Sequence, residues 1–552
     1  MSQRDRRVFG SNFISHAKEK SVFFDIAIIL SVVSSIILLV CVKTLAKQTF
    51  IVFFEFIFLF AMLILKYNLI GDIKRSYFVQ AFINNQGLCI AALIVAAICL
   101  LVSYPGNLYS DSYGRFGLVK KLKQITYDAI KGHPQNVSSW LNVTPTLFMA
   151  FFYYLTGNLA SYAFAQAFFF FYVTMILVKR LCKRCRFLAY ILFASNPVFF
   201  CVSTYYEIAV GCAIGVAALV LLLTIDESKL KPLDKILQAL LIAFSGYVTF
   251  GFRYNAFTMI PVFVVLAYFF QRSMRGKIVA IVVLFLGLLF VAVIPKFLNI
   301  KPLSRSCDGF IWKMGTTFAR MPPEKYERNK CYLDDFFGDG STERLANGLK
   351  SLYGSDNFNT NICYMFDIEG FSVGNMTNVG LKKIFQKYIL LFLKEPKAAI
   401  NTELLFGAYV LGIPPRQIYL WEWDYDRWER GREFGLNDSK MRHRFMDAYR
   451  IVVERTYIPL HPWLMLLITC FFVFIKLKFF RIKILDSLEA WLILLAIFYY
   501  GAFVINTQSM EFRYFYPAFY CLALADISCI SAFAGEGLSK IKEVVAKCQR
   551  QS

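Results

Sequence analysis

Residues 87–102 read "GLCIAALIVAAICLLV" and contain no charged side chain. A run of about 20 apolar residues spans the hydrocarbon core of a bilayer as an α-helix. Similar runs recur along the 552-residue chain. The period-two alternation of a transmembrane barrel is found nowhere in the sequence. The sequence therefore predicts an all-α polytopic membrane protein.

The composition agrees with this prediction. Hydrophobic residues make up 58% of the chain and charged residues 18%, whereas a soluble domain carries about 25% charged residues. The formal net charge of +23 is explained by lysines and arginines gathered in short loops on one side of the membrane. No nucleic-acid-binding motif accompanies that charge, so we expect no nucleic acid as a partner.

We expect about twelve transmembrane helices. They lie near residues 23–43, 50–66, 87–104, 158–178, 187–206, 207–225, 237–252, 255–270, 278–295, 461–475, 488–505 and 513–534.

The positive-inside rule gives the orientation. With the N-terminus in the cytoplasm, almost every loop assigned to the cytoplasm is strongly basic. We therefore expect both termini to be cytoplasmic. Residues 145–155 must then not cross fully. Residues 384–412 are interpreted as two amphipathic helices on the membrane surface, with a hairpin of two short spans as the alternative.

These predictions divide the chain into seven parts. They are a cytoplasmic N-terminus (1–22), three transmembrane helices (23–104), a first outer loop with amphipathic helices (105–157), a central transmembrane bundle (158–295), a large outer loop domain (296–460), three transmembrane helices (461–534) and a cytoplasmic tail (535–552).

A single acid follows the first quoted run. In "SYPGNLYSDSYGR" (103–115), Pro105 and Gly106 fit the two central positions of a type II turn. Asp111 comes shortly afterwards, just above the expected membrane surface. It is interpreted either as the N-cap of the next helix or as a general base.

Two arginines are expected at the same outer face. Arg253 and Asn255 separate two apolar runs, and Arg513 and Tyr514 precede the last one. An arginine offers a planar fork that suits phosphate, although snorkelling to the interface is the simpler explanation for Arg253. A simple ion pair between Glu511 and Arg513, with no further role, is the alternative interpretation of these two residues. Together, two arginines and a carboxylate at one interface suggest binding of an anionic lipid headgroup and acid–base chemistry.

Further candidates are less specific. Glu207 stands inside a long apolar run and is a possible second acid, or is merely interfacial. Trp140, Trp421 and Trp423 are candidates for sugar contacts, although "WEWDYDRWE" (421–429) suits packing of a loop domain equally well. One disulfide among Cys307, Cys331 and Cys363 is left open. No residues are assigned as metal ligands.

Short motifs in this order resemble bacterial membrane glycosyltransferases with the GT-C fold. The motifs are "Pro105-Gly106…Asp111-Ser112", "Trp140-Leu-Asn-Val-Thr-Pro145-Thr", "Arg253-Tyr254-Asn255-Ala256", "Lys394-Glu-Pro396" and "Arg513-Tyr514…Pro517". The resemblance covers most of the chain in layout and only these pieces in detail. It differs where related sequences often show Lys-Asp in place of Tyr206-Glu207, and no second acid adjoins Asp111.

The resemblance implies an enzyme of the cytoplasmic (inner) membrane. It would move a sugar from a polyprenyl-phosphate donor to a cell-surface glycan (O-antigen, capsule, teichoic acid or similar) on the outer face of that membrane. It implies Asp111 as the catalytic base. Arg253, Asn255, Arg513 and Tyr514 would bind the lipid phosphate of the donor. The expected reaction is a direct displacement with inversion. A divalent metal cofactor and the role of Glu207 are left open.

Two alternatives share the lipid-linked ligand. A lipid-linked glycan polymerase or ligase would use the same donor and a large outer loop. A flippase or transporter of lipid-linked oligosaccharide should carry charges deep in several spans, and the predicted spans are nearly free of charge at mid-depth.

Overall fold

The computed structural model describes most of the chain beyond residue 75. The described residues are 76–104, 106–107, 115–122, 124, 142–206, 208–298, 300, 307–353, 368–414, 418, 440–456, 458–506 and 511–551. Within these residues the protein is mostly helical, and an isolated parallel β-bridge joins Asn107 to Tyr205. The chain separates into two compact units.

The smaller unit comprises residues 1–86, 121–133 and 229–237. Its described part includes α4 (Tyr77–Ile83) and the first turns of α12 (Pro232–Phe252). The Ser76 hydroxyl, just before α4, donates a hydrogen bond of 2.5 Å to Asp234 in the first turn of α12.

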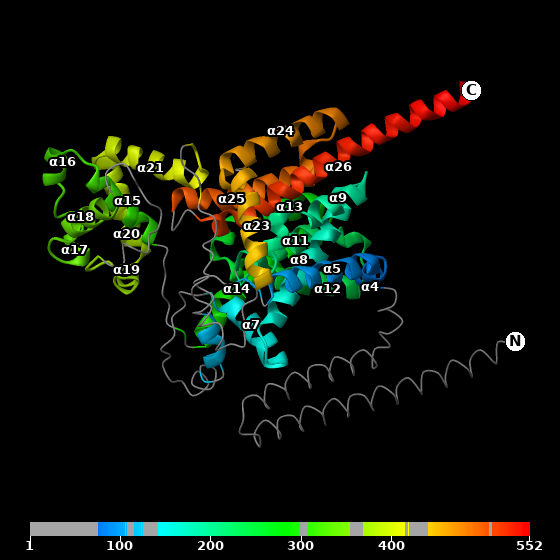
Figure 1. Ribbon diagram of the computed structural model, residues 1–552. Helices are drawn as coiled ribbons and strands as arrows, with labels where there is room; N and C mark the ends of the chain where they lie inside the picture. Colours follow the sequence, from blue (N-terminus) through cyan, green and yellow to red (C-terminus); the bar gives the residue numbers. More distant parts are fainter. Residues whose placement is uncertain are drawn as a thin grey trace, which may run out of the picture. The chain divides into compact units, whose positions relative to one another are not determined.

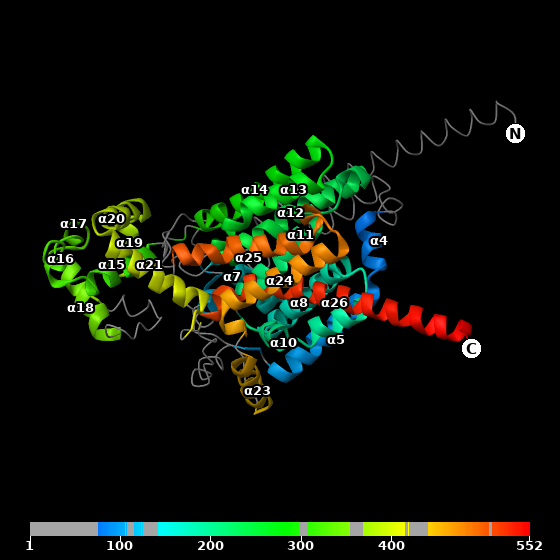
Figure 2. The ribbon, with the colours of Figure 1, turned by 90° about the horizontal axis from the view of Figure 1, so that it is seen from above.

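The larger unit contains the helical bundle (Figures 1 and 2). Its helices are α5 (Gln86–Ser103), α7 (Val143–Thr156), α8 (Ala160–Leu181), α9 (Arg186–Ala194), α10 (Pro197–Val202), α11 (Ile208–Leu223), α12, η2 (Tyr254–Met259), α13 (Ile260–Phe270), α14 (Met274–Phe297), α24 (Pro462–Phe480), α25 (Leu488–Ile505) and α26 (Phe512–Gln551).

Seven of the described helices are long and apolar enough to cross a membrane, so the protein is a multi-pass membrane protein. They are α5, α8, α12, α14, α24, α25 and the first part of α26. The predicted spans at 187–206, 207–225 and 255–270 correspond to shorter or broken helices. The predicted spans at 23–43 and 50–66 lie outside the described residues. The segment predicted as a tail continues α26 to Gln551.

The long apolar run at 187–225 is interrupted twice. The expected break near "STYYE" is present, because α10 ends at Val202 and α11 begins at Ile208. A second break, between α9 and α10, was not predicted. Asn196 caps α10 there by accepting hydrogen bonds from the backbone N–H groups of Val198 and Phe199, at 3.0 and 3.2 Å.

The first part of helix α26 packs against α24 and α25, and its C-terminal part extends beyond them (Figures 1 and 2). Beside α26, aromatic rings fill the space between α8 and α10. Tyr520 of α26 lies 5.6 Å from the Phe170 ring and 5.8 Å from the Phe199 ring, measured between ring centroids. The first pair is tilted and the second is edge-to-face, and aromatic pairs of this kind add about 0.5–1.5 kcal/mol each beyond burial of their area. These contacts hold the first half of α26 beside α8 and α10.

The bundle has two ends. The arginine end is marked by Arg253, after α12, and Arg513, at the start of α26; the lysine end is marked by Lys476 and Glu489. Helix α5 finishes at the arginine end beside the link 203–206, where Ser103 and Thr204 hydroxyls lie 2.8 Å apart. Helix α8 begins beside the same link, to which Gln166 donates. The segment between α5 and α8, which includes α7, therefore starts and finishes at the arginine end of the bundle.

The segment predicted as a large outer loop is helical where it is described. It contains α15 (Asp308–Ala319), α16 (Pro323–Glu327), α17 (Asp334–Phe337), α18 (Ser341–Tyr353), α19 (Val373–Val379), α20 (Leu381–Lys394), α21 (Pro396–Leu411) and α23 (Lys440–Thr456). Residues 384–412 form two helices broken at Glu395–Pro396. Helices α15 to α21 form one group (Figure 1), called the loop domain below.

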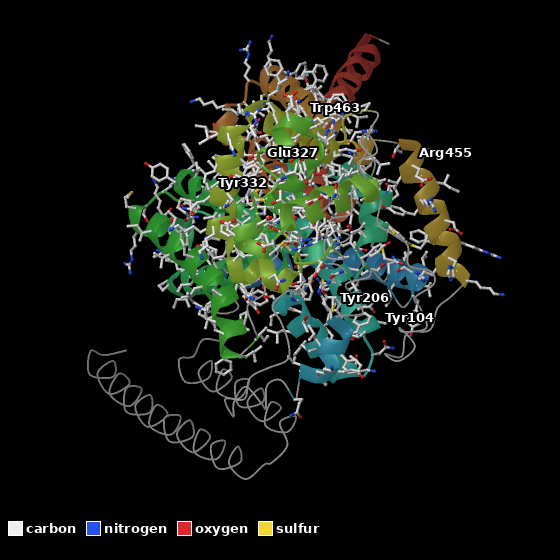
Figure 3. The ribbon with its side chains drawn as sticks, turned by 90° about the vertical axis from the view of Figure 1, so that its left-hand side faces the viewer. Tyr104, Tyr206, Glu327, Tyr332, Arg455 and Trp463 are labelled. Carbon is white, nitrogen blue, oxygen red and sulfur yellow. The ribbon has the colours of Figure 1, made fainter. Side chains whose placement is uncertain are left out.

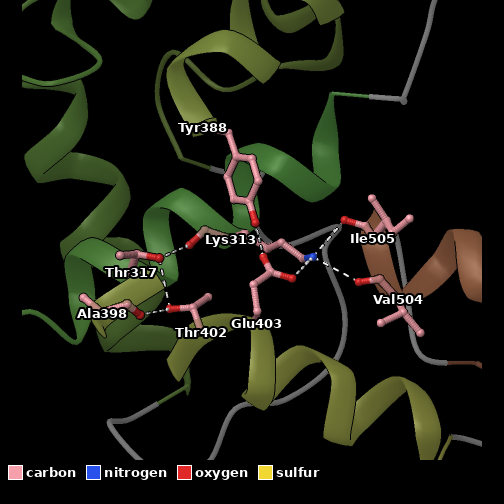
Figure 4. A network of polar contacts seen from close by, with 8 residues as sticks. All are labelled: Lys313, Thr317, Tyr388, Ala398, Thr402, Glu403, Val504 and Ile505. Carbon is pink, nitrogen blue, oxygen red and sulfur yellow. Dashed lines mark hydrogen bonds and ion pairs between the residues drawn. The ribbon is translucent and has the colours of Figure 1, made fainter. Parts of the chain in front are cut away.

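A buried cation joins the loop domain to the bundle (Figure 4). The Lys313 amine of α15 donates to Glu403 of α21 at 2.6 Å, and to the carbonyl oxygens of Val504 and Ile505 at 3.1 and 2.8 Å. These carbonyls end α25, where a helix carries partial negative charge. Lys313 thus ties the loop domain to the arginine end.

Candidate functional site

The structure describes four of the predicted site residues. These are Arg253, Asn255, Arg513 and Tyr514. The predicted catalytic Asp111, the possible second acid Glu207 and the three tryptophans Trp140, Trp421 and Trp423 lie outside the described residues.

Arg253 occupies the break between α12 and η2. Its backbone is extended, with φ −132° and ψ 107°, so that α12 ends at Phe252 and the chain turns into the next helix. The side chain is only 6% exposed. Burial of a guanidinium is costly unless it is paired or hydrogen-bonded, which excludes simple snorkelling into water as the explanation for this residue.

Arg513 lies in the first turn of α26 and is also buried, at 8% exposed. Its Nε lies 2.6 Å from the Glu511 carboxylate, so the two residues form an ion pair. A cation in the first turn of a helix is unfavourable with respect to the helix dipole. Its position there requires compensation, and Glu511 supplies part of it.

The two arginines meet on one aromatic ring. Arg253 Nη2 donates to the backbone oxygen of Arg513 at 3.2 Å. The Arg253 and Arg513 Cζ atoms lie 4.8 and 5.0 Å from the centroid of the Tyr514 ring. Two guanidinium groups from helices 260 residues apart in the chain are thus held together by Tyr514, through cation–π contacts of about 0.5–2 kcal/mol each.

Asn255 lies next to this cluster in the chain but contributes less to it. It is half-buried, and its backbone oxygen accepts a hydrogen bond from the Thr258 hydroxyl at 2.8 Å. Among the described residues, no hydrogen bond joins the Asn255 side chain to either arginine.

Arg115 was not predicted as a site residue. It begins a helical stretch at 115–122, is 2% exposed, and has buried Nε and Nη1 atoms without a hydrogen-bond partner among the described residues. It interacts electrostatically with Tyr254, the neighbour of Arg253, and the next residue, Phe116, packs on the Tyr206 ring at 5.1 Å. Arg115 therefore adds a third buried guanidinium at the arginine end.

The turn after α5 holds residues 106–107 against the link 203–206. Asn107 donates its backbone N–H to Thr204, at 3.1 Å, and accepts from Tyr206 at 3.0 Å. The turn differs from the expected type II turn, because its hydrogen bond joins Gly106 N–H to Ser103 one residue earlier. Tyr104 lies close to Tyr206 at this place (Figure 3).

Gly106 is required there for two reasons. Its φ of +116° is strained for residues with a side chain, and a Cβ would lie 2.8 Å from the Tyr206 ring.

We expect Gly106→Ala to lower the free energy of unfolding by about 2 kcal/mol, measured by thermal unfolding in detergent. Gly87→Ala is the matched control. Its Cβ would meet nothing within 4 Å, and Ala is the better helix former, so this change should not destabilise the protein.

The described residues show neither a metal site nor a disulfide between the predicted cysteines. No group of three or more His, Cys, Asp or Glu side chains suited to a metal ion occurs in the part of the chain that the structure describes. Cys307 and Cys331 do not form a disulfide with each other, and Cys363 lies outside the described residues. Asp526 is a carboxylate within α26 that accepts a hydrogen bond from Thr469 at 3.0 Å, so the spans are not entirely free of charge.

Comparison with protein-family models, with curated proteins and with solved structures finds no match to this chain.

Proposed function

We propose that the protein is a membrane glycosyltransferase that moves a sugar from a polyprenyl-phosphate donor to a cell-surface glycan. The observation that carries the proposal is the meeting of Arg253 and Arg513 on Tyr514 at the arginine end. Guanidinium groups form paired hydrogen bonds with phosphate oxygens, and burial strengthens their attraction to an anion. The arrangement suits a phosphate that reaches the protein from the membrane.

Arg115 supports the same proposal independently. Two of its nitrogen atoms are buried and have no hydrogen-bond partner among the described residues. Burying a charged group without hydrogen-bond partners lowers the stability of the folded protein by several kcal/mol. A bound phosphate would supply the missing acceptors.

The proposed base is Asp111. The described residues on either side of it in the chain lie at the arginine end: Asn107 is hydrogen-bonded to the link 203–206, and Phe116, next to Arg115, packs on Tyr206 of the same link. In the proposed reaction, Asp111 takes the proton of an acceptor hydroxyl. That oxygen forms a bond to the anomeric carbon, the bond from this carbon to the phosphate oxygen breaks, and polyprenyl phosphate leaves with the electron pair.

The arginines act on the leaving group. Charge builds up on the phosphate as its bond to the sugar breaks, and fixed cations in a water-poor site stabilise that charge without reorganising. The single displacement inverts the anomeric centre. The outer face of the cytoplasmic membrane is the proposed location, because the loops at the lysine end are the basic ones.

The direct test is release of polyprenyl phosphate. Purified protein is incubated with a polyprenyl-phosphate sugar and a glycan acceptor, and the free lipid phosphate is measured. We expect release that depends on acceptor and falls by at least about 100-fold in Asp111→Asn, while the amount of folded protein stays normal. A transporter would move the intact donor without releasing lipid phosphate, and full activity of Asp111→Asn would remove that residue from the mechanism.

A glycan polymerase or ligase is separated by its product. Either would also release the lipid carrier, but a polymerase would lengthen its product by repeating units. A flippase is less well supported. Asp526 and the pair Lys476–Glu489, which lie within described spans, are each held by hydrogen bonds to neighbouring side chains, whereas a transport path needs polar groups that face a shared interior.

A further inference from the structure

A cavity of about 630 Å³ opens at the lysine end of the bundle. It lies among the last turn of α8, the link that follows it, the end of α13, the end of α24, the start of α25 and one face of α26. The proposed transfer reaction does not use this cavity, because neither Arg253 nor Arg513 lines it.

One wall of the cavity is a buried ion pair whose hydrogen bonds are supplied by the pair itself and by neighbouring serines. The Lys476 amine donates to Glu489 at 2.5 Å and to the Ser528 hydroxyl at 2.9 Å. Glu489 also accepts from Ser528 at 2.5 Å and from Ser487 at 2.6 Å. This pair is neutral as a whole and fully hydrogen-bonded, so it needs no ligand and serves as a rigid polar wall.

The rest of the polar lining is mainly cationic. Arg180, Lys183 and Arg184 line the cavity together with one further acid, Asp486. Arg180 donates to the backbone oxygen of Thr224, just after the end of α11. Arg184 forms an ion pair with Glu536, which does not line the cavity. Four cationic and two acidic side chains therefore line the space, an excess of two positive charges.

Apolar side chains complete the cavity. They include Phe270, Phe480, Ile482 and Leu488. Ile484 and Leu485, in the turn beside Ile482, are 64% and 47% exposed. Cations beside exposed apolar residues, between helices that are long and apolar enough to span a membrane, match a ligand with a phosphate and a hydrocarbon part.

We propose that this cavity binds the phosphate headgroup of an anionic glycerophospholipid from the leaflet at the lysine end. The headgroup phosphate lies against Lys183 and its neighbouring arginines, and an acyl chain follows Phe480, Ile482 and Leu485 out into the bilayer. Basic pockets between membrane helices bind anionic headgroups in this way. A soluble phosphate would use the cations and leave the apolar wall unused.

The test compares two exposed lysines of the same bundle end. The full-length protein is reconstituted into vesicles of phosphatidylcholine with phosphatidylglycerol, extracted in mild detergent, and its retained lipid is measured by mass spectrometry. We expect phosphatidylglycerol to be retained and Lys183→Glu to weaken retention about 30-fold, from about 1 kcal/mol for each of the two charge units changed. Lys478→Glu, a reversal at an exposed lysine that does not line the cavity, should leave retention nearly unchanged.

Three outcomes would overturn the proposal. Equal losses in both variants would show attraction to the surface as a whole. Equal retention of phosphatidylcholine would show that the cavity does not select for the negative charge of the headgroup. Displacement of the lipid by millimolar inorganic phosphate would assign the cavity to a soluble anion. Both lysines are exposed, and thermal unfolding verifies that each variant folds. Transfer activity is not the readout, so failure of the proposed function leaves this test valid.

Discussion

Replacement of Arg253 by Ala is expected to lower sugar transfer by about 100- to 1000-fold, the usual cost of one fixed donor to a developing anion. The side chain is 6% exposed and stacks on Tyr514, so no neighbouring surface cation can take its place. Because the proposed role concerns the departing phosphate, kcat should fall more than the donor's KM rises.

The controls separate charge from geometry. Arg253→Lys keeps the charge but loses the planar fork, and should recover only part of the activity. Tyr514→Phe keeps the ring on which both arginines stack and removes the hydroxyl that accepts from Arg513 at 3.4 Å. A hydrogen bond of that length is weak, so this variant should stay within about 10-fold of the wild type. Normal activity of a folded Arg253→Ala protein would exclude Arg253 from the site.

The meeting of the two arginines could be expected from the sequence in part. Apolar runs that alternate in direction place the residue after one span and the residue before another at the same end, and this applies to Arg253 and Arg513. The contact itself could not be predicted, since it depends on how α12 and α26 pack. Arg115 lay within the first quoted loop, but no local pattern distinguishes a buried arginine from an exposed one.

The helix boundaries could likewise be predicted from the sequence only in part. The break at Asn196–Pro197 had a local signal, because Asn caps helices and Pro favours the first turn, but it was hidden within an apolar run. Helix α26 continues beyond the predicted span to Gln551. Hydropathy reports the thickness of the membrane and not the end of the helix, and residues such as Glu, Lys and Ala after 534 are good helix formers.

The second large effect is expected at Lys313, which joins the loop domain to the bundle. Its side chain is fully buried, and Glu403 is 27% exposed. Burial lowers the pKa of the Lys313 amine, and the Glu403 carboxylate opposes that shift. Burial and the same carboxylate raise the pKa of Tyr388 far above its usual value, so its hydroxyl stays protonated and donates to Glu403.

Lys313→Met is expected to cost about 3–5 kcal/mol of stability, because the remaining carboxylate and the carbonyls that end α25 lose their cation. Thermal unfolding in detergent and limited proteolysis of residues 307–414 measure the loss. Adding Glu403→Gln should restore part of it, since the amide carries no charge and still accepts from Tyr388. Lys330→Met removes one partner of an exposed pair, Lys330 with Glu327, and should leave the unfolding temperature unchanged.

The double variant decides how the domain is held. Recovery in Lys313→Met with Glu403→Gln means that the single variant suffers mainly from an unpaired buried charge. No recovery means that the bonds from Lys313 to Val504 and Ile505 carry the attachment, since these are absent from both variants. Either result keeps Lys313 as the connection between the loop domain and α25. A Lys313→Met protein that unfolds and is cleaved like the wild type would show that the connection lies elsewhere.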